Sequence, residues 1–172
     1  MPEERPTSPG AGGAHRLAMI DVGPKAPTRR RAVAQGRIRM SGACFATIRD
    51  GTNPKGDVLA QAEVAGILGA KRTAEMIPLC HPLGLEQVLV RFELDAATSS
   101  VVASCEAVTT AKTGVEMEAL SGVTTALLAI YDLAKAVDPA LLITDVHLWS
   151  KEGGKSGLWL NPLRPGGEET TR

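Results

Sequence analysis

Aromatic residues are scarce in this sequence, and there is no excess of charge of either sign. The 172 residues include two Phe, two Trp and one Tyr, and 19 Lys and Arg are balanced by 19 Asp and Glu. A chain with few side chains for base stacking and no net electric field has little with which to bind nucleic acid or an anionic membrane. We therefore expect neither as a partner, and any anion site must be local.

Cysteine is also scarce, and the three that occur are scattered. Cys44, Cys80 and Cys105 form no Cys-x-x-Cys pair, so they predict neither a disulfide framework nor a metal site. The first residues contain acids and no apolar core, and we see no apolar run that predicts a membrane span. A cytoplasmic protein with reduced thiols is expected.

The two ends of the chain differ in composition from its middle. Residues 1–16 and 158–172 are rich in Pro, Gly and charge, a composition that buries little apolar surface, so both are expected to be flexible tails. Residues 17–157 contain no repeat and no linker. They predict a single domain.

Strands are predicted where apolar residues alternate with polar ones. In residues 86–95, Val88, Val90 and Phe92 fall on one side of an extended chain. Residues 101–110 continue the pattern after a short polar loop, which predicts an antiparallel hairpin. Further strands are expected at residues 142–150 and 31–40.

Three helices are predicted from periodicity and end signals. The first begins at Ser41 as its N-cap and ends at Gly51, the second spans residues 57–76, and the third spans residues 116–138. Ile77 before Pro78 marks the end of the second helix, because proline disfavours helical geometry in the residue before it. Helices mixed with a hairpin indicate an α+β fold.

The third predicted helix carries an unusual pair of charges. Asp132 and Lys135 are the only charged side chains between Glu118 and Asp138, and their spacing places them on one face. The rest of the helix is apolar or small, so we expect it to be buried in the core, where a charged pair is costly unless it has a purpose or reaches solvent. Spacing alone leaves a functional pair and a structural ion pair equally open.

Two further segments contain candidate binding residues. In IPLCHPL, the prolines hold Cys80 and His81 in a stiff, extended chain; His81 then either satisfies a loop hydrogen bond or binds a heterocycle or phosphate. In TAKTGVEMEAL, Glu116 and Glu118 begin the third helix. Either they are favoured there by the helix dipole, or they accept hydrogen bonds from a guanine-like edge.

Basic residues fall in small clusters, and most clusters of this size lie on the solvated surface. SKEGGKSG differs, because its glycine-rich backbone beside Lys151 and Lys155 could hold a phosphate, although the spacing is not that of a Walker loop.

Four segments together resemble one family. DVGPKAPTRRRAVAQGRIRM, KGDVLAQAEVAGILGAKRTAEMIPLCHPL, TAKTGVEMEALSGVTTALLAIYDLAKAVD and SKEGGKSG are similar to the cyclic pyranopterin monophosphate synthases of molybdenum cofactor biosynthesis, over residues 19–157. The resemblance implies a ferredoxin-like, antiparallel sheet packed against helices. It also implies a homohexamer, a trimer of dimers, with active sites at subunit interfaces.

The same resemblance implies an activity and roles for particular residues. The family converts 3′,8-cyclo-7,8-dihydroguanosine 5′-triphosphate into cyclic pyranopterin monophosphate and releases diphosphate. No cofactor is required, although Mg²⁺ can accompany the purine-derived triphosphate. The matching catalytic positions are Asp132, Lys135, Lys55 and Lys151, and the matching substrate-binding positions are Leu79, Cys80, His81, Met117, Glu118, Glu116, Arg30, Lys71 and Lys155.

For the chemistry, we expect a lysine to act as general acid or base once neighbouring cations or burial lower its pKa, with Asp132 orienting Lys135.

Two other classes of protein compete with the interpretation as an enzyme. A nucleic-acid-binding module is disfavoured by the few aromatic residues, and an inactive scaffold is disfavoured because the charged residues of the pocket are all present.

Overall fold

Most of the elements expected from periodicity are present in the computed structural model, which describes residues 17–163. The expected tail of residues 1–16 lies outside the described residues, as do residues 164–172 of the other tail. In chain order the elements are β1 (Thr28–Arg39), α1 (Gly42–Arg49), α2 (Val58–Lys71), α3 (Thr73–Met76), β2 (Gln87–Asp95), β3 (Ser100–Ala111), α4 (Glu116–Ala134), β4 (Leu142–Glu152), the 3₁₀ turn η1 (Gly154–Ser156) and β5 (Trp159–Leu160).

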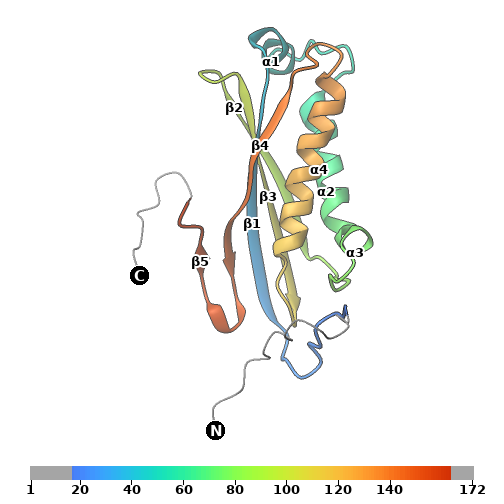
Figure 1. Ribbon diagram of the computed structural model, residues 1–172, viewed down its shortest axis with the longest axis vertical. Coiled ribbons are helices and arrows are strands. Elements are labelled where there is room, and N and C mark those ends of the chain that lie inside the picture. Colours follow the sequence, from blue (N-terminus) through green and yellow to red (C-terminus); the bar gives the residue numbers. More distant parts are fainter. Residues whose placement is uncertain (1–16, 164–172) are drawn as a thin grey trace, which may run out of the picture.

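The strands form one antiparallel sheet in the order β2-β3-β1-β4-β5. β1 lies in the middle because β3 pairs with one of its edges and β4 with the other, and α4 carries the chain from β3 to β4. The helices α2 and α4 lie side by side against one face of the sheet (Figure 1). This arrangement is α+β and ferredoxin-like, as expected.

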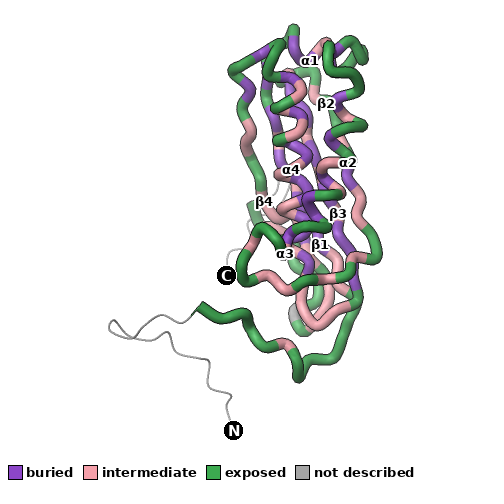
Figure 2. The backbone as a smooth tube through the Cα atoms, turned by 90° about the vertical axis from the view of Figure 1, so that its right-hand side faces the viewer, coloured by how far each residue is buried: buried purple, intermediate pink, exposed green. Residues whose placement is uncertain are grey.

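The core lies between the sheet and α4. Small residues on β1, such as Ala32 and Ala34, alternate with outward-facing neighbours, and Val101 and Cys105 do the same on β3. Leu127 on α4 is fully buried against them. Figure 2 shows the buried residues running along β1, β3 and α4.

Glycines bring α2 and α4 into close contact. A methyl group at Gly66 would lie 3.0 Å from the carbonyl oxygen of Gly122, and one at Gly69 would lie 3.1 Å from the carbonyl oxygen of Ser121. Any larger residue would force the helices apart, so these positions set the distance between them.

Capping side chains begin two of the helices where the sequence predicts. Ser41 Oγ accepts a hydrogen bond from the Cys44 backbone N–H at 3.3 Å, and Asp57 Oδ1 accepts one from Ala60 at 3.0 Å. Each cap satisfies an N–H group that has no partner within the helix.

Two predicted helices are shorter than expected. The helix expected over residues 57–76 breaks at Arg72, where the Thr73 hydroxyl donates to the Ala70 carbonyl at 2.9 Å and competes with the helical pattern. The helix expected over residues 116–138 ends at Ala134. Asp138 instead accepts hydrogen bonds from the backbone N–H groups of Ser41 and Ala140, at 2.7 and 2.8 Å.

The segment expected to be a flexible tail from residue 158 onward begins with ordered structure. Trp159 and Leu160 form β5, which pairs with Lys151 and Ser150 of β4, and Asn161 Nδ2 donates to the Leu148 carbonyl at 2.8 Å. Pairing with β5 satisfies backbone N–H and C=O groups on the free edge of β4. Composition alone does not reveal this pairing.

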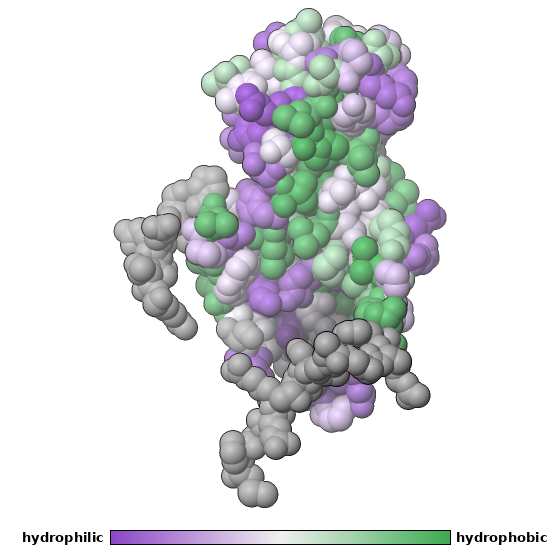
Figure 3. Space-filling view, viewed as in Figure 1, coloured by the Kyte–Doolittle hydropathy of each residue, from purple (hydrophilic) through white to green (hydrophobic). Residues whose placement is uncertain are grey.

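We expected no apolar run of membrane-spanning length, but α4 is long and apolar enough by length and composition. Its contacts with α2 and the sheet account for that composition, because 44% of its most apolar window is buried inside the protein. Further apolar side chains remain exposed beside it. Figure 3 shows a hydrophobic band over β4 and the adjoining part of α4, where Leu128, Leu142 and Val146 are exposed.

Candidate functional site

A cluster of three charged side chains lies at the C-terminal end of α4. Asp132 is on the last turn and Lys135 caps the helix, with Lys135 Nζ 2.6 Å from Asp132 Oδ1. Lys55 reaches them from the loop between α1 and α2, with its Nζ 3.6 Å from Asp132 Oδ2 and 3.2 Å from the Asp132 backbone oxygen. The structure thus joins Lys55 to the predicted pair.

The loop that carries Lys55 is held by two hydrogen bonds of its own. Asn53 Oδ1 accepts from the Lys55 backbone N–H at 2.9 Å, and Gln61 Nε2 donates to the Lys55 carbonyl at 3.0 Å. Since both partners lie within six residues of Lys55, the local sequence positions this lysine.

The charged cluster is open to solvent, whereas we expected the helix around it to be buried. The side chains of Asp132 and Lys135 are 60% and 53% exposed, because they lie on the outward face of the last turn, whose other face buries Ala134 in the core. The opening to solvent removes the desolvation cost that made the pair unusual.

The ion pair shifts the pKa values of Asp132 and Lys135 in the directions that favour their charged forms. The hydrogen bond and charge of Lys135, with Lys55 adding, hold the pKa of Asp132 below its ordinary value. Asp132 in turn raises the pKa of Lys135. We expected nearby cations or burial to lower the lysine pKa, and this was wrong for the single chain, because the carboxylate is closer to Lys135 than any cation.

A cavity of about 410 Å³ lies at the other end of α4. Six residues predicted as substrate-binding line it together, from the IPLCHPL segment and from the first turn of α4: Leu79, Cys80, His81, Glu116, Met117 and Glu118. The cavity is concave and mostly apolar with a few polar groups, as small-molecule sites are.

Two carboxylates differ sharply within this cavity. Glu118 is buried, at 5% exposure, and burial, with the charge of Glu116 adding, raises its pKa. Glu116 is paired with Lys151, whose Nζ lies 3.0 Å from Glu116 Oε1. Glu118 is therefore the carboxylate without a cation and the one whose charge a ligand donor would stabilise.

His81 and Cys80 contribute differently to the cavity. His81 Nε2 lies 2.8 Å from the Ile20 backbone oxygen, which is the loop hydrogen bond that the sequence left open. Burial, with Glu118 adding, raises the pKa of the Cys80 thiol, so this cysteine is not an activated nucleophile.

The remaining predicted basic residues lie around the cavity to different degrees. Arg30 and Lys151 line a neighbouring space of about 40 Å³ that shares Glu116. Lys71 lines another of about 120 Å³ that shares Glu118. Lys155 is exposed on η1 and lines neither space.

The segment before β1 also lines the main cavity, which the sequence did not predict. Ala18, Ile20, Val22 and Lys25 contribute, and Lys112 Nζ donates to the Gly23 carbonyl at 2.6 Å. No local spacing signal links residues that are about 60 to 90 positions apart. Only a match of the whole segment to a family could have indicated this role.

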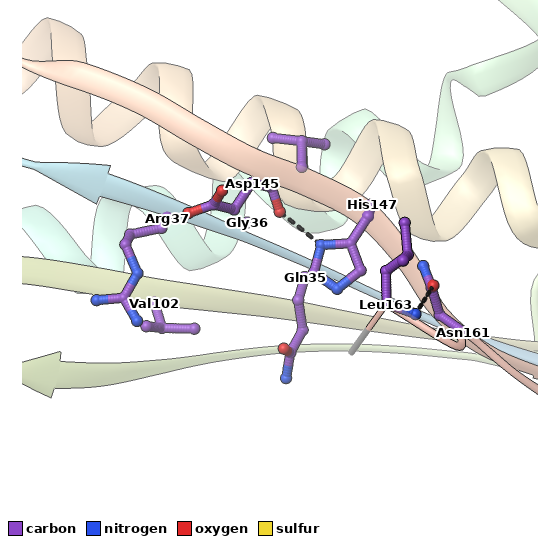
Figure 4. A pocket seen from close by; sticks show the side chains of 9 residues that line it. Gln35, Gly36, Arg37, Val102, Asp145, His147, Asn161 and Leu163 are labelled. Atoms are coloured by element: carbon purple, nitrogen blue, oxygen red, sulfur yellow. Dashed lines mark hydrogen bonds between the residues drawn. The ribbon is translucent and has the colours of Figure 1, made fainter. Parts of the chain in front are cut away.

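A separate cavity of about 350 Å³ opens on the sheet and contains none of the predicted site residues (Figure 4). His147 faces it, with Nδ1 2.6 Å from the Asp145 backbone oxygen, and Gln35 and Arg37 border it from β1. Among residues 17–163, no three His, Cys, Asp or Glu side chains lie close enough to hold a metal ion.

The two sets of predicted residues lie far apart within one chain. With a rise of about 1.5 Å per residue, Glu116 and Asp132 are about 24 Å apart along α4. Proton transfer requires heavy atoms about 3 Å apart. Lys135 therefore cannot exchange a proton with the part of a ligand that Glu118 of the same chain holds.

Fold and site together define a ferredoxin-like α+β protein with a mostly apolar cavity that contains two carboxylates and has basic side chains around it. The model of the MoaC family matches residues 19–154, and the chain belongs to this family. Its role is in molybdenum cofactor biosynthesis, as an enzyme of that pathway. The resemblance that the sequence motifs indicate is thereby confirmed.

Proposed function

We propose that the chain is a cyclic pyranopterin monophosphate synthase. It converts 3′,8-cyclo-7,8-dihydroguanosine 5′-triphosphate into cyclic pyranopterin monophosphate and releases diphosphate. The observation that carries this proposal is the grouping of the matched residues into two compact sets, one charged and one lining a cavity. Residues far apart in sequence meet in each set, as a working site requires.

The cavity supplies recognition of the purine-derived ring. Ionised carboxylates only accept hydrogen bonds, so Glu118 and Glu116 suit the amino and ring N–H groups of a guanine-like edge. Met117 and Leu79 add apolar contact beside them. A ligand N–H at Glu118 also offsets the cost of its burial.

The charged cluster supplies the chemistry. The reaction opens one ring, rebuilds it as a pyranopterin and closes a cyclic phosphate, so it needs proton donors and stabilisation of negative charge. Asp132 orients Lys135 and raises its pKa, which suits the Lys135 ammonium to stabilising an anion rather than to acting as a base. Lys55 and Lys151 add positive charge as diphosphate leaves.

The triphosphate is assigned to Arg30, Lys71 and Lys155, because guanidinium and ammonium groups bind phosphate oxygens strongly. The proposal requires no cofactor. A Mg²⁺ ion can accompany the triphosphate as part of the substrate.

We place the active site between subunits of a homohexamer, a trimer of dimers, in the cytoplasm. The separation of about 24 Å along α4 supports this, because a second chain can bring its own charged cluster to the cavity of the first. The exposed apolar band over β4 and α4 (Figure 3) offers surface for such contacts.

The test is to supply the cyclic dihydroguanosine triphosphate to the purified protein. We expect cyclic pyranopterin monophosphate and diphosphate in equal amounts, with none from the Asp132→Asn variant as the control. Unchanged substrate in the presence of folded wild-type protein would overturn the proposal. Tight binding without turnover would indicate an inactive scaffold, and binding of single-stranded nucleic acid would indicate the competing module.

A further inference from the structure

Two glycines follow β4 in a turn that lies beside the first residues of β1. Gly153 and Gly154 have positive φ values of 108° and 68°, a region that other residues rarely adopt. The register pairs Arg31 with Glu152 just before the turn. The turn therefore faces the Arg29–Arg30 end of β1.

The space that a side chain would need at Gly154 is occupied by Arg30. The three atoms nearest to a Cβ at this position would all belong to the Arg30 guanidinium, and the closest contact would be an overlap with its terminal nitrogen. A Cβ at Gly153 would overlap the Arg29 backbone oxygen and lie 3.2 Å from Arg30 Cδ. The absence of both side chains thus makes the groove in which Arg30 lies.

Among residues 17–163, no hydrogen bond holds the Arg30 side chain in this groove. Its Nε is buried without a partner, and no carboxylate within the described part of the chain forms a salt bridge with it. The neighbouring Arg31 differs, because it makes two hydrogen bonds to Glu106, at 2.9 and 2.8 Å. Arg30 is therefore positioned by shape, with its charge left for another group.

The Arg30 charge faces a small space that four other charged groups border. Arg31, Glu116, Lys151 and Glu152 share this space of about 40 Å³ with it. The Lys151–Glu116 and Arg31–Glu106 ion pairs largely cancel themselves, and within residues 17–163 Glu152 forms no salt bridge with Arg30. Arg30 therefore contributes a positive charge that no salt bridge of the described residues neutralises. A phosphate oxygen is the group that would satisfy it.

We propose that Gly153 and Gly154 are positioning residues, whose missing side chains set where the Arg30 guanidinium meets a substrate phosphate. This inference rests on the proposed function, which assigns Arg30 to the triphosphate. It gives the glycines of SKEGGKSG a specific task that does not require their own N–H groups to bind the anion.

The test uses Gly154→Ala in the full chain, with inorganic diphosphate as the probe and calorimetry as the measurement. The displaced group is the end of a flexible side chain, so the fold should tolerate the methyl group while Arg30 moves. Gly157→Ala is the matched control, because Gly157 also has a positive φ, of 60°, and a Cβ there meets nothing within 4 Å. We expect diphosphate affinity to fall about tenfold in Gly154→Ala and to stay unchanged in Gly157→Ala.

A double-variant cycle with Arg30→Ala separates a lost contact from a damaged loop. We expect Arg30→Ala to weaken diphosphate binding about tenfold, and Gly154→Ala to add no further loss in that background. If Gly154→Ala alone does not fold, its recovery by Arg30→Ala supports the proposal; failure of both to fold, beside a folded Gly157→Ala, overturns it.

The remaining outcomes distinguish this inference from the proposed function. Unchanged binding in Arg30→Ala would remove Arg30 from the triphosphate site and so contradict that part of the proposed function. Weakened binding in Arg30→Ala with unchanged binding in Gly154→Ala would overturn the positioning role alone. Equal losses in Gly154→Ala and Gly157→Ala would also overturn it, because backbone strain would then be the cause.

Discussion

The exposure of the Asp132–Lys135 ion pair argues against a structural role for it. Both side chains are more than half exposed, and exposed ion pairs contribute little to stability. A pair that contributes little to folding, yet gathers Lys55 from a distant loop, is better explained by what it does to a bound molecule.

For this pair we expect activity and stability to respond differently to substitution. Lys135→Ala should reduce turnover of the cyclic triphosphate by about a hundredfold or more, and Asp132→Asn should be severely impaired, since it removes the carboxylate charge that orients and tunes Lys135. Neither should shift the melting temperature measurably. Assays of turnover and thermal unfolding on the same samples check this, and a stable Lys135→Ala protein with near-normal turnover would rule out the proposed role.

Glu118 should show the opposite behaviour, because it is buried and its pKa is raised. A carboxyl with a raised folded-state pKa reduces stability as pH rises from the unfolded-state pKa through the folded-state pKa. Glu118→Gln removes this pH-dependent loss of stability, because glutamine does not ionise. We expect the variant to be more stable than wild type at neutral pH and equal to it below the unfolded-state pKa of glutamate, about 4.3.

The same variant should bind substrate more weakly, with KM raised about tenfold through loss of a charged acceptor. Urea unfolding at neutral and acidic pH, with the steady-state KM, measures both effects. The interpretation fails if wild type and Glu118→Gln lose stability in parallel across this pH range and share one KM.

At the scale of elements, α4 carries residues of both parts of the candidate site. Its middle packs on the sheet and on α2, while its first turn lines the cavity and its last turn carries Asp132. The distance between the two sets of residues is therefore fixed by the length of one helix, and the packing of that helix keeps both in place.

The contact between α2 and α4 can be tested at Gly69. A methyl group there would lie 2.6 Å from Thr125 Cβ and 3.1 Å from the Ser121 carbonyl oxygen. Gly69→Ala should therefore lower the free energy of unfolding by about 1 to 2 kcal/mol, despite the better helix propensity of alanine. Gly42→Ala on α1 is the control, since its nearest neighbour would be Ser99 Oγ at 3.8 Å, and urea unfolding of both variants decides the matter.

Local signals predicted where elements begin better than where they end. Ser41 and Asp57 cap their helices as expected, because N-capping depends on a few adjacent residues. The break at Arg72 and the early end of α4 depend on hydrogen bonds whose outcome the sequence does not reveal. For α4 the partner is Ser41, 97 residues from Asp138.

The site was predictable in its parts and not in its assembly. Spacing paired Asp132 with Lys135, and family motifs named the cavity residues. Neither could show that the cluster is exposed, that Asp132 raises the lysine pKa, or that residues 18–25 line the cavity. The exposure and the cavity lining depend on packing between segments that are far apart in the chain, and the pKa shift depends on the side-chain geometry that the pair adopts at the end of α4.

At the scale of the whole molecule, the two ends of α4 require more than one chain. We expect light scattering at micromolar concentration to give the mass of six copies of the 18.0 kDa chain, about 108 kDa. A monomer that retains full activity on dilution would contradict the shared site, because that site takes Lys135 and Glu118 from different chains.

The most direct test of the account is complementation between two impaired variants, assayed at substrate concentrations well below KM so that both defects lower turnover. Lys135→Ala and Glu118→Gln damage opposite ends of α4, so a mixed dimer contains one site with both defects and one site with neither. Co-expressed chains with different tags, purified through both tags, should regain about a quarter to a half of wild-type turnover, depending on how the chains mix. Mixed assemblies no more active than either variant alone would contradict a site built from the cluster of one chain and the cavity of another.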